Sequence, residues 1–229
     1  MHKIDVNYSY FPISSTNEGI LINLLHNKSI NLTIDVGANN GDWLNGLRKI
    51  GYTRNVISFE PLSTEFSKLK TAAKYDNHWE VFNCAISNEN KEVEINISEN
   101  SVSSSLSQIL NSHTDAAPES KYIEKQSVKS ICLDGFKHNW VNSSNAIFLK
   151  IDVQGYEKKV LDGASKVLEK VKVLQIEMSF KKMYSHDLCF SKMKDFLEAK
   201  GFLLFHIQNG FRSRLTTELL QVDALFIRK

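Results

Sequence analysis

Residues 33–44, TIDVGANNGDWL, join a run of β-forming residues to a helical segment through a turn that holds two glycines. Gly37 lets the backbone leave the strand sharply and lets a ligand come close, because glycine has no Cβ. Asn39 is the type of non-glycine residue that best tolerates left-handed backbone angles. Gly41 opens the helix, whose free N–H groups attract an anionic group. The stretch therefore predicts a strand–turn–helix unit with a ligand at the turn, and an ordinary strand–helix connection is the alternative.

The same alternation of strands and helices continues along the chain. Near-continuous apolar strands that alternate with amphipathic helices are typical of α/β folds with a sheet covered on both faces. We therefore predict an α/β three-layer sandwich, in which the last two strands pair antiparallel because no helix separates them. The predicted helices are 16–28, 42–49, 63–74 with Ser63 as N-cap, 157–168 and 188–200. The predicted strands are 32–36, 56–59, 80–86, 92–97, 127–133, 146–153, 171–178, 202–207 and 222–227.

The chain totals fit one domain of ordinary soluble composition. The chain has 229 residues and a formal net charge of +2, which is too small to argue for a nucleic acid or a membrane surface as partner. No dense basic stripe interleaved with aromatic residues appears. We take 1–229 as one domain, with 1–31 as an N-terminal cap segment. Residues 98–125, rich in short polar side chains, predict a lid or loop insertion.

The three cysteines, Cys84, Cys132 and Cys189, are far apart and form no CxxC or metal-binding spacing. We interpret them as buried free thiols in a reducing compartment. The N-terminus lacks the apolar stretch of a signal peptide, and no segment is long and apolar enough to span a bilayer. The sequence therefore predicts a cytoplasmic protein without a membrane span.

Acidic residues end several of the predicted strands. Ligands of parallel α/β sheets bind at the carboxyl ends of the strands, so Asp35, Glu60, Asp152 and Glu177 are candidates. Glu60 follows the second strand at about the spacing at which an acid accepts hydrogen bonds from ribose hydroxyls, although a helix-capping or surface acid would look the same. The chain has neither a GxGxxG nor a GxxxxGK(S/T) pattern. These features favour a nucleoside-type ligand other than NAD or ATP.

Six motifs occur in order: DVGANNG at 35–41, FEP at 59–61, NCAIS at 83–87, SSSL at 103–106, LDGF at 133–136 and LKIDVQGYEKKVLDGA at 149–164. Together they resemble the FkbM family of class I S-adenosylmethionine-dependent methyltransferases, and the last block is the most specific. Gln154 stands there in place of that family's usual Glu, which keeps the hydrogen-bonding shape but loses the charge. The resemblance implies a Rossmann-like class I methyltransferase fold with a mostly parallel seven-stranded sheet and an antiparallel last strand.

The resemblance also implies S-adenosyl-L-methionine as the cofactor and assigns residues to it. Its methionine part would lie against the turn residues Asp35, Gly37, Ala38, Asn39 and Gly41. The ribose hydroxyls would bind Glu60, which Pro61 follows. Ala85 and Ile86 would line the adenine pocket. The serines of SSSL, Ser105 among them, would close over the site, and a polar loop without a ligand is the alternative for them.

Asp152 and Glu177 are the candidates for the chemistry. A neutral hydroxyl needs a base to take its proton as it attacks, and the two carboxylates could act as base and orienting acceptor. They could instead hold a divalent cation, but no third ligand stands at a suitable spacing, so no metal is predicted. Lys150 lies on the same strand face as Asp152 and either orients it or forms a structural ion pair. His186 is a further candidate base or a solvated loop residue.

The leading hypothesis is an O-methyltransferase for a small-molecule or glycan hydroxyl, above all on a sugar or glycoconjugate; a polyketide-like or other small metabolite is the alternative acceptor. The acceptor class rests on the resemblance alone. A dehydrogenase is disfavoured by the missing GxGxxG, and a non-catalytic nucleoside-binding module by intact Asp35, Glu60 and Asp152. A homodimer is left open. Three aromatic residues would cover the acceptor cleft or pack on the sheet: Tyr8, Tyr10 and Phe11.

Overall fold

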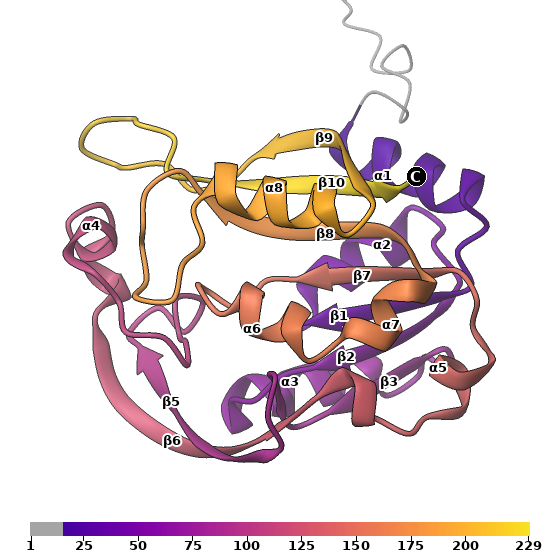
Figure 1. Cartoon of the computed structure of the whole chain (residues 1–229). Coiled ribbons are helices and arrows are strands. Elements are labelled where there is room, and N and C mark those ends of the chain that lie inside the picture. Colours follow the sequence, from indigo (N-terminus) through magenta and orange to yellow (C-terminus); the bar gives the residue numbers. More distant parts are fainter. Residues whose placement is uncertain (1–15) are drawn as a thin grey trace, which may run out of the picture.

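The computed structural model describes residues 16–229, and a seven-stranded sheet forms its centre (Figure 1). Its strands are β1 (Leu32–Val36), β2 (Asn55–Phe59), β3 (Trp79–Phe82), β7 (Ile147–Ile151), β8 (Val171–Ser179), β9 (Phe202–Asn209) and β10 (Gln221–Arg228), in the order β3-β2-β1-β7-β8-β10-β9. The first five run parallel to their neighbours, whereas β10 pairs antiparallel with both β8 and β9. The predicted mostly parallel sheet with an antiparallel last strand is confirmed.

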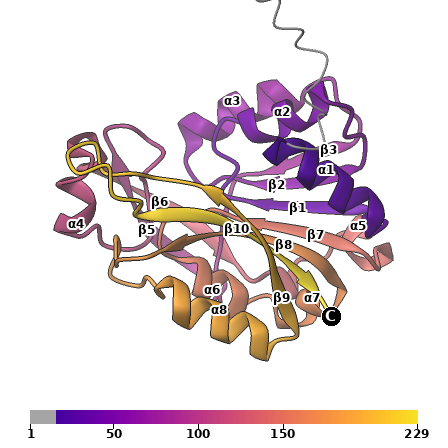
Figure 2. The same cartoon turned by 90° about the horizontal axis from the view of Figure 1, so that it is seen from above.

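Helices cover both faces of this sheet, which gives the predicted three layers (Figure 2). One face carries α1 (Asn17–Asn27), α2 (Asp42–Lys49) and α3 (Ser63–Ala73), and the other carries α6 (Glu157–Asp162), α7 (Ser165–Lys170) and α8 (Phe190–Ala199). The central strand β7 is buried on both sides: Phe148 joins the core under α1 and α2, and Leu149 joins the core under α6 and α8. That double burial is why its sequence, IFLKI, is almost continuously apolar.

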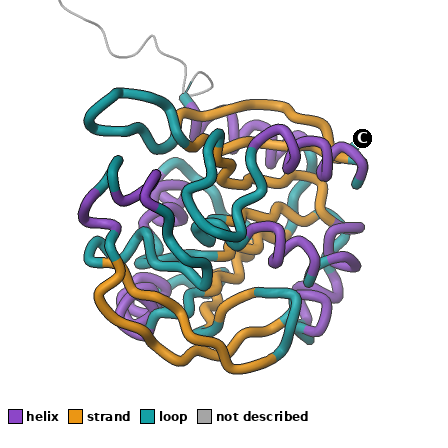
Figure 3. Tube along the Cα trace, turned by 60° about the vertical axis from the view of Figure 1, so that its left-hand side comes forward, coloured by secondary structure: helices purple, strands orange, loops and turns teal. Residues whose placement is uncertain are grey.

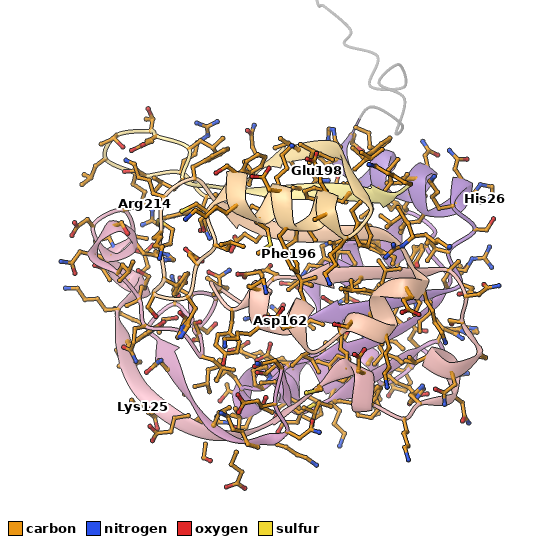
Figure 4. All side chains as sticks on the ribbon, in the orientation of Figure 1. His26, Lys125, Asp162, Phe196, Glu198 and Arg214 are labelled. Atoms are coloured by element: carbon orange, nitrogen blue, oxygen red, sulfur yellow. The ribbon has the colours of Figure 1, made fainter. Side chains whose placement is uncertain are left out.

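The layer formed by α6 and α8 is also held by its outer side chains. Figure 4 labels Phe196 on α8, and the Lys158 ammonium of α6 lies over this ring, 4.4 Å from its centre. A cation over an aromatic face is attracted by the ring quadrupole. The two helices therefore contact each other above the sheet as well as through the core.

A second, three-stranded sheet projects from the first and bends away from it, at the lower left of Figure 1. It consists of β4 (Ala85–Ile86), β6 (Tyr122–Ile131) and β5 (Lys91–Ser98), in that order. The prediction of one strand over 80–86 is therefore wrong, because this stretch divides between two sheets. The Asn83 side-chain amide donates to the carbonyls of Glu60 and Pro61 at 2.9 Å each, and it turns the chain at the division.

The segment 98–125 is more ordered than the predicted lid or loop. It contains α4 (Asn111–Thr114) and a short 3₁₀ turn, η3 (Pro118–Ser120), and its last residues belong to β6. Arg214, in the loop between β9 and β10, pairs with Glu119 of η3 at 2.5 Å and lies beside this segment in Figure 4. Two further short elements, η4 (Leu133–Gly135) and α5 (Asn139–Ser143), lead from β6 to β7.

The predicted helix over 157–168 is wrong in its continuity. It breaks into α6 and α7 at Gly163, where a Cβ would lie 2.0 Å from the carbonyl oxygen of Ser87. The Asp134 carboxylate accepts the N–H groups of Lys166 and Val167 at 2.9 and 3.0 Å, and so caps the new helix. Close contact with the small sheet and a long-range cap therefore override the continuous helical pattern.

Two local expectations about helix ends had different outcomes. Ser63 is the first helical residue of α3 and not its N-cap; Leu62 is the N-cap, and the Ser63 hydroxyl donates instead to Gln126 at 2.9 Å. The end of α8 before Gly201 is confirmed, since Gly201 has a left-handed φ of 85°.

The cysteines are free, as expected, but only Cys84 is buried, while Cys132 and Cys189 are partly exposed. Within residues 16–229, no helix combines the length and the apolar character needed to cross a membrane.

Candidate active site

The turn after β1 is tightly folded against the end of β7. Gly37 has a φ of 82°, and a Cβ on it would lie 1.8 Å from the main-chain oxygen of Asp152. The Asp152 N–H donates to the carbonyl of Val36 at 3.0 Å, which fixes this approach. Glycine is therefore required here by a neighbouring strand end, in addition to any approach of a ligand.

The other turn residues explain the rest of the motif. Asn39 adopts the predicted left-handed conformation, with a φ of 49°. Gly41 also has a positive φ, and a Cβ there would lie 2.7 Å from the Trp79 ring, so this glycine serves packing under α2. The N–H groups of Gly37 and Ala38 both donate to the carbonyl of Phe59 at 3.1 Å. At the start of α2, the Gly41 N–H donates to the Ala38 carbonyl at 3.0 Å and the Asp42 N–H donates to the Asn40 side-chain oxygen at 3.1 Å, so these two donors are used within the fold.

Glu60, directly after β2, is held by the same turn. Its two carboxylate oxygens accept the main-chain N–H groups of Asn39 and Leu62, each at 2.8 Å. Burial raises the pKa of Glu60 to about 7, against the lowering effect of these two hydrogen bonds. Each oxygen keeps a second lone pair for a ligand hydroxyl. Glu60 is thus a fixed double acceptor at the edge of a pocket.

That pocket lies at the carboxyl ends of β1, β2 and β7, where loops gather on the side that Figure 3 turns forward. Seven of the ten predicted cofactor residues line it: Gly37, Asn39, Glu60, Pro61, Ala85, Ile86 and Ser105. Asp35, Ala38 and Gly41 do not. Its further lining is mainly apolar, from Phe59, Leu62, Ile95, Val102 and Leu106. The pocket therefore offers an acid for hydroxyl groups beside apolar walls that suit a flat ring.

Asp35 points away from this pocket into a buried ion pair. It is 1% exposed, and its carboxylate lies 3.2 Å from the Lys150 ammonium and accepts from the Ser58 hydroxyl at 3.2 Å. Burial lowers the pKa of Lys150, but the carboxylates of Asp35 and Asp152 outweigh it, and the pKa is raised. The ammonium stays charged, and it lies 3.6 Å from Asp152. The geometry realises both sequence alternatives: Lys150 forms a buried pair and also contacts Asp152.

Three carboxylates stand in a row across the end of the sheet. Asp223 of β10 lies opposite Glu177 of β8. Asp152 follows β7, and the Gln154 amide nitrogen donates at 2.9 Å to both Asp152 and Glu177. Burial and Asp152 raise the pKa of Asp223 to about 6, with Lys150 opposing them. Burial and then Asp152 raise the pKa of Glu177 well above its ordinary value. We call Asp152, Glu177 and Asp223 the acidic row.

Asp223 is a site residue that the sequence analysis missed. The signal was present, because a single acid interrupts the apolar strand QVDALFIR. Among residues 16–229, no hydrogen-bond donor reaches the Asp223 carboxylate within bonding distance, whereas Glu177 accepts from Gln154 and Gln221. The row is therefore rich in acceptors and poor in donors.

The remaining candidates lie around the mouth of the pocket. The Ser105 hydroxyl donates to the main-chain oxygen of Gln154 at 2.6 Å, so the 98–125 segment contacts the turn after β7. His186 is exposed, 2.9 Å from the Ser107 hydroxyl, with its ring 5.7 Å from that of the pocket residue Tyr156. Tyr8, Tyr10 and Phe11 lie outside the described residues. In the part of the chain that the structure describes, no group of three His, Cys, Asp or Glu side chains is placed to hold a metal ion.

Comparison with known proteins identifies the family and the class of fold. A family model described as "Methyltransferase FkbM domain" matches residues 35–204. The magnesium protoporphyrin IX methyltransferase of Synechocystis PCC 6803, solved with bound SAM, aligns with a TM-score of 0.50 at 11% identity, over 93% of this chain and 77% of that chain. Precorrin-6y C5,15-methyltransferase of Geobacter metallireducens GS-15 gives 0.49 at 11%, over 92% and 87%. Among curated proteins, no sequence matches this chain significantly.

Proposed function

The chain belongs to the FkbM methyltransferase family, which uses S-adenosyl-L-methionine, and on that premise we propose that it methylates a hydroxyl group of a sugar or glycoconjugate. The observation that carries the acceptor class is the acidic row beside the pocket. A polyol brings several O–H donors, and Asp152, Glu177 and Asp223 offer more acceptor oxygens than their donors occupy. An apolar acceptor would leave those carboxylates desolvated and unpaired, which is costly.

The pocket fits the cofactor by the chemistry of its lining. Glu60 would accept the two ribose hydroxyls, because its oxygens are fixed by main-chain donors yet keep free lone pairs. Ala85 and Ile86 would pack on the adenine ring. Gly37 and Asn39 would border the methionine part, and Asp35 would act there indirectly, by fixing Lys150. Bound S-adenosyl-L-methionine supplies a methyl group that is already activated on a sulfonium.

The chain's own contribution is then alignment and proton removal. Asp152 lines the pocket, keeps 36% of its side chain exposed, and would take the proton of the acceptor hydroxyl as the oxygen attacks. Lys150 would orient Asp152, since its ammonium is 3.6 Å away and buried. Glu177 and Asp223 would accept the hydroxyl groups that flank the reacting one. Alignment of this kind supplies a large part of the rate in bimolecular transfers.

The 98–125 segment would act as the lid of this site, within one domain that spans 1–229. Five of its residues line the pocket: Ser101, Val102, Ser104, Ser105 and Leu106. The Ser105–Gln154 hydrogen bond ties the segment to the turn that carries the acidic row. Closure would exclude water from the reacting groups, which strengthens the electrostatic interactions among them.

The acceptor class is tested by methyl transfer from labelled S-adenosyl-L-methionine to paired acceptors. Each pair contains a sugar and its deoxy or fully O-methylated analogue, and a phenol and an aliphatic alcohol complete the panel. We expect label on the sugars that keep neighbouring hydroxyls, and a loss of about 10-fold in kcat/KM when one neighbour is removed, since a buried acceptor then lacks its donor. Transfer to the phenol with none to any sugar would contradict the proposal.

A further inference from the structure

Gln154 holds an uncommon position in the turn between β7 and α6. Its φ is +57°, in the left-handed region that is strained for a non-glycine residue. The next residue, Gly155, is pressed against Tyr184, because a Cβ on it would lie 2.3 Å from the Tyr184 Cβ. A strained backbone at the edge of a pocket is kept only where its surroundings determine it. The contacts of the side chain show what this conformation achieves.

Every hydrogen-bonding group of the Gln154 amide is used. Its nitrogen lies 2.9 Å from Asp152 Oδ1 and 2.9 Å from Glu177 Oε2, so each of its two hydrogens serves one carboxylate. Its oxygen accepts from the Tyr184 hydroxyl at 2.9 Å. The reverse orientation of the amide would turn its oxygen, which only accepts hydrogen bonds, toward the oxygens of two carboxyl groups. The orientation is therefore set by chemistry as well as by geometry.

Two close carboxylates ordinarily cannot both be ionised, since their repulsion is relieved by a shared proton or a cation. Lys150 reaches only one of this pair, Asp152. Near Glu177 the donors are neutral amides, those of Gln154 and Gln221. The Gln154 nitrogen is the one group among the described residues that donates to both carboxylates.

We propose that Gln154 is a positioning residue that holds Asp152 and Glu177 side by side by donating one hydrogen to each, in the place that a bridging proton or cation would otherwise take. This inference rests on the proposed role of the pair in binding the acceptor. The main-chain oxygen of Gln154 accepts from Ser105, so the contact with the 98–125 segment belongs to the backbone and does not need the amide. The hydrogens of the side-chain amide are therefore available to Asp152 and Glu177.

The test replaces Gln154 with Glu, a side chain of the same length that has no N–H to give. At pH 8, Gln154→Glu should lower kcat/KM for the acceptor about 10- to 100-fold, because three carboxylates then meet. Activity should recover in part as the pH falls toward 6, since a protonated carboxyl donates one hydrogen bond. The affinity for S-adenosylhomocysteine, measured by calorimetry, should stay within about 3-fold of wild type. A wild-type pH profile in this variant would overturn the proposal.

The matched control is Gln108→Glu, which makes the same charge change on an exposed side chain outside the pocket. It should keep the wild-type profile. A second readout needs no acceptor: the side-chain carboxyl carbons are titrated by NMR in wild type and in Gln154→Ala. We expect the pKa of Glu177, already raised by burial and by Asp152, to rise further in the variant. An unchanged titration overturns the role of Gln154, even if the acceptor is not a sugar.

Discussion

The two halves of the site are built in different ways. Much of the cofactor half lies within one stretch, residues 37–62, and its acid Glu60 is held by main-chain N–H groups. The acceptor half takes Asp152, Glu177 and Asp223 from three strands, and side-chain amides and Lys150 hold them. Main-chain geometry is local and tolerant of neighbouring side chains, whereas the acidic row depends on strand register. Mutations in the two halves should therefore change different measured quantities. In the cofactor half they should lower stability and cofactor affinity, and in the acceptor half they should lower turnover.

The largest expected effect comes from Gly37→Ala, at the point where the halves touch. The new Cβ would meet the Asp152 carbonyl oxygen at 1.8 Å, at a φ of 82°. Strain and overlap together should lower the free energy of unfolding by about 2–5 kcal/mol. Urea denaturation followed by circular dichroism measures the loss. The matched control is Gly46→Ala in α2, where a Cβ has open space, and it should be neutral or stabilising by up to about 1 kcal/mol. Equal midpoints for the two variants would refute the prediction.

Asp152→Asn should separate the halves most cleanly. It keeps the shape but removes the base, so kcat should fall by about 10²- to 10⁴-fold. The dissociation constant of S-adenosylhomocysteine should change by less than about 3-fold, because Glu60 and the apolar walls remain. Single-turnover assays and calorimetry give the two numbers. If kcat is retained, Asp152 has no part in proton removal.

Glu60→Gln should show the opposite pattern, with a smaller effect. Losing the charged acceptor should weaken S-adenosylhomocysteine binding about 10-fold, with little change in kcat at saturation. In the wild type, the carboxylate protonates as the pH falls through about 7, so affinity should decline below that pH. The variant should bind with a flatter pH dependence between pH 6 and 8. Calorimetry over that range checks both statements, and parallel curves for the two proteins would exclude Glu60 as the titrating acceptor.

The raised pKa of Glu60 also determines how the stability of the folded protein changes with pH. Its folded pKa is raised from 4.5 to about 7, so the folded state holds the proton more tightly than the unfolded chain does. This group's contribution to stability is therefore greatest below pH 4.5 and is lost as the pH rises toward 7. A buried carboxylate that faces the pocket therefore lowers the stability of the folded state near neutral pH.

Sequence reasoning worked best where structure is local. The strand 32–36 and the helix 42–49 are found with the predicted bounds, and the left-handed Asn39 follows from its residue type. The seven-stranded sheet with its antiparallel last strand followed from the family resemblance together with the alternation of elements. Four of the predicted cofactor residues, Gly37, Asn39, Glu60 and Pro61, meet in one pocket because they follow neighbouring strands whose carboxyl ends share one edge of the parallel sheet.

Long-range contacts account for what the sequence could not give. The break at Gly163 depends on Ser87, and the end of β3 depends on the contact of Asn83 with Glu60 and Pro61. From the sequence, Asp35 is predicted to face the ligand. In the structure it forms an ion pair with Lys150 on the neighbouring strand β7. In the sequence, Gln154 differs from the family's usual Glu only by a lost charge. In the structure its amide nitrogen links Asp152 with Glu177. In each case the partner lies in another element, which no local pattern encodes.

The contact of Gly163 with Ser87 has a mechanical consequence. The small sheet is anchored there, because Gly163 also accepts the Asp134 N–H at 3.0 Å and Ser87 donates to Ile131 at 2.9 Å. From that base β5 and β6 run outward together, and the loop that follows the far end of β5 carries five of the residues that line the pocket (Figure 1). The small sheet is thus fixed at one end, so a slight tilt there causes a larger displacement at its far end. A single methyl group at position 163 would press on the fixed end, beside the pocket residue Ile86, and would displace the pocket residues beyond the far end of β5 as well.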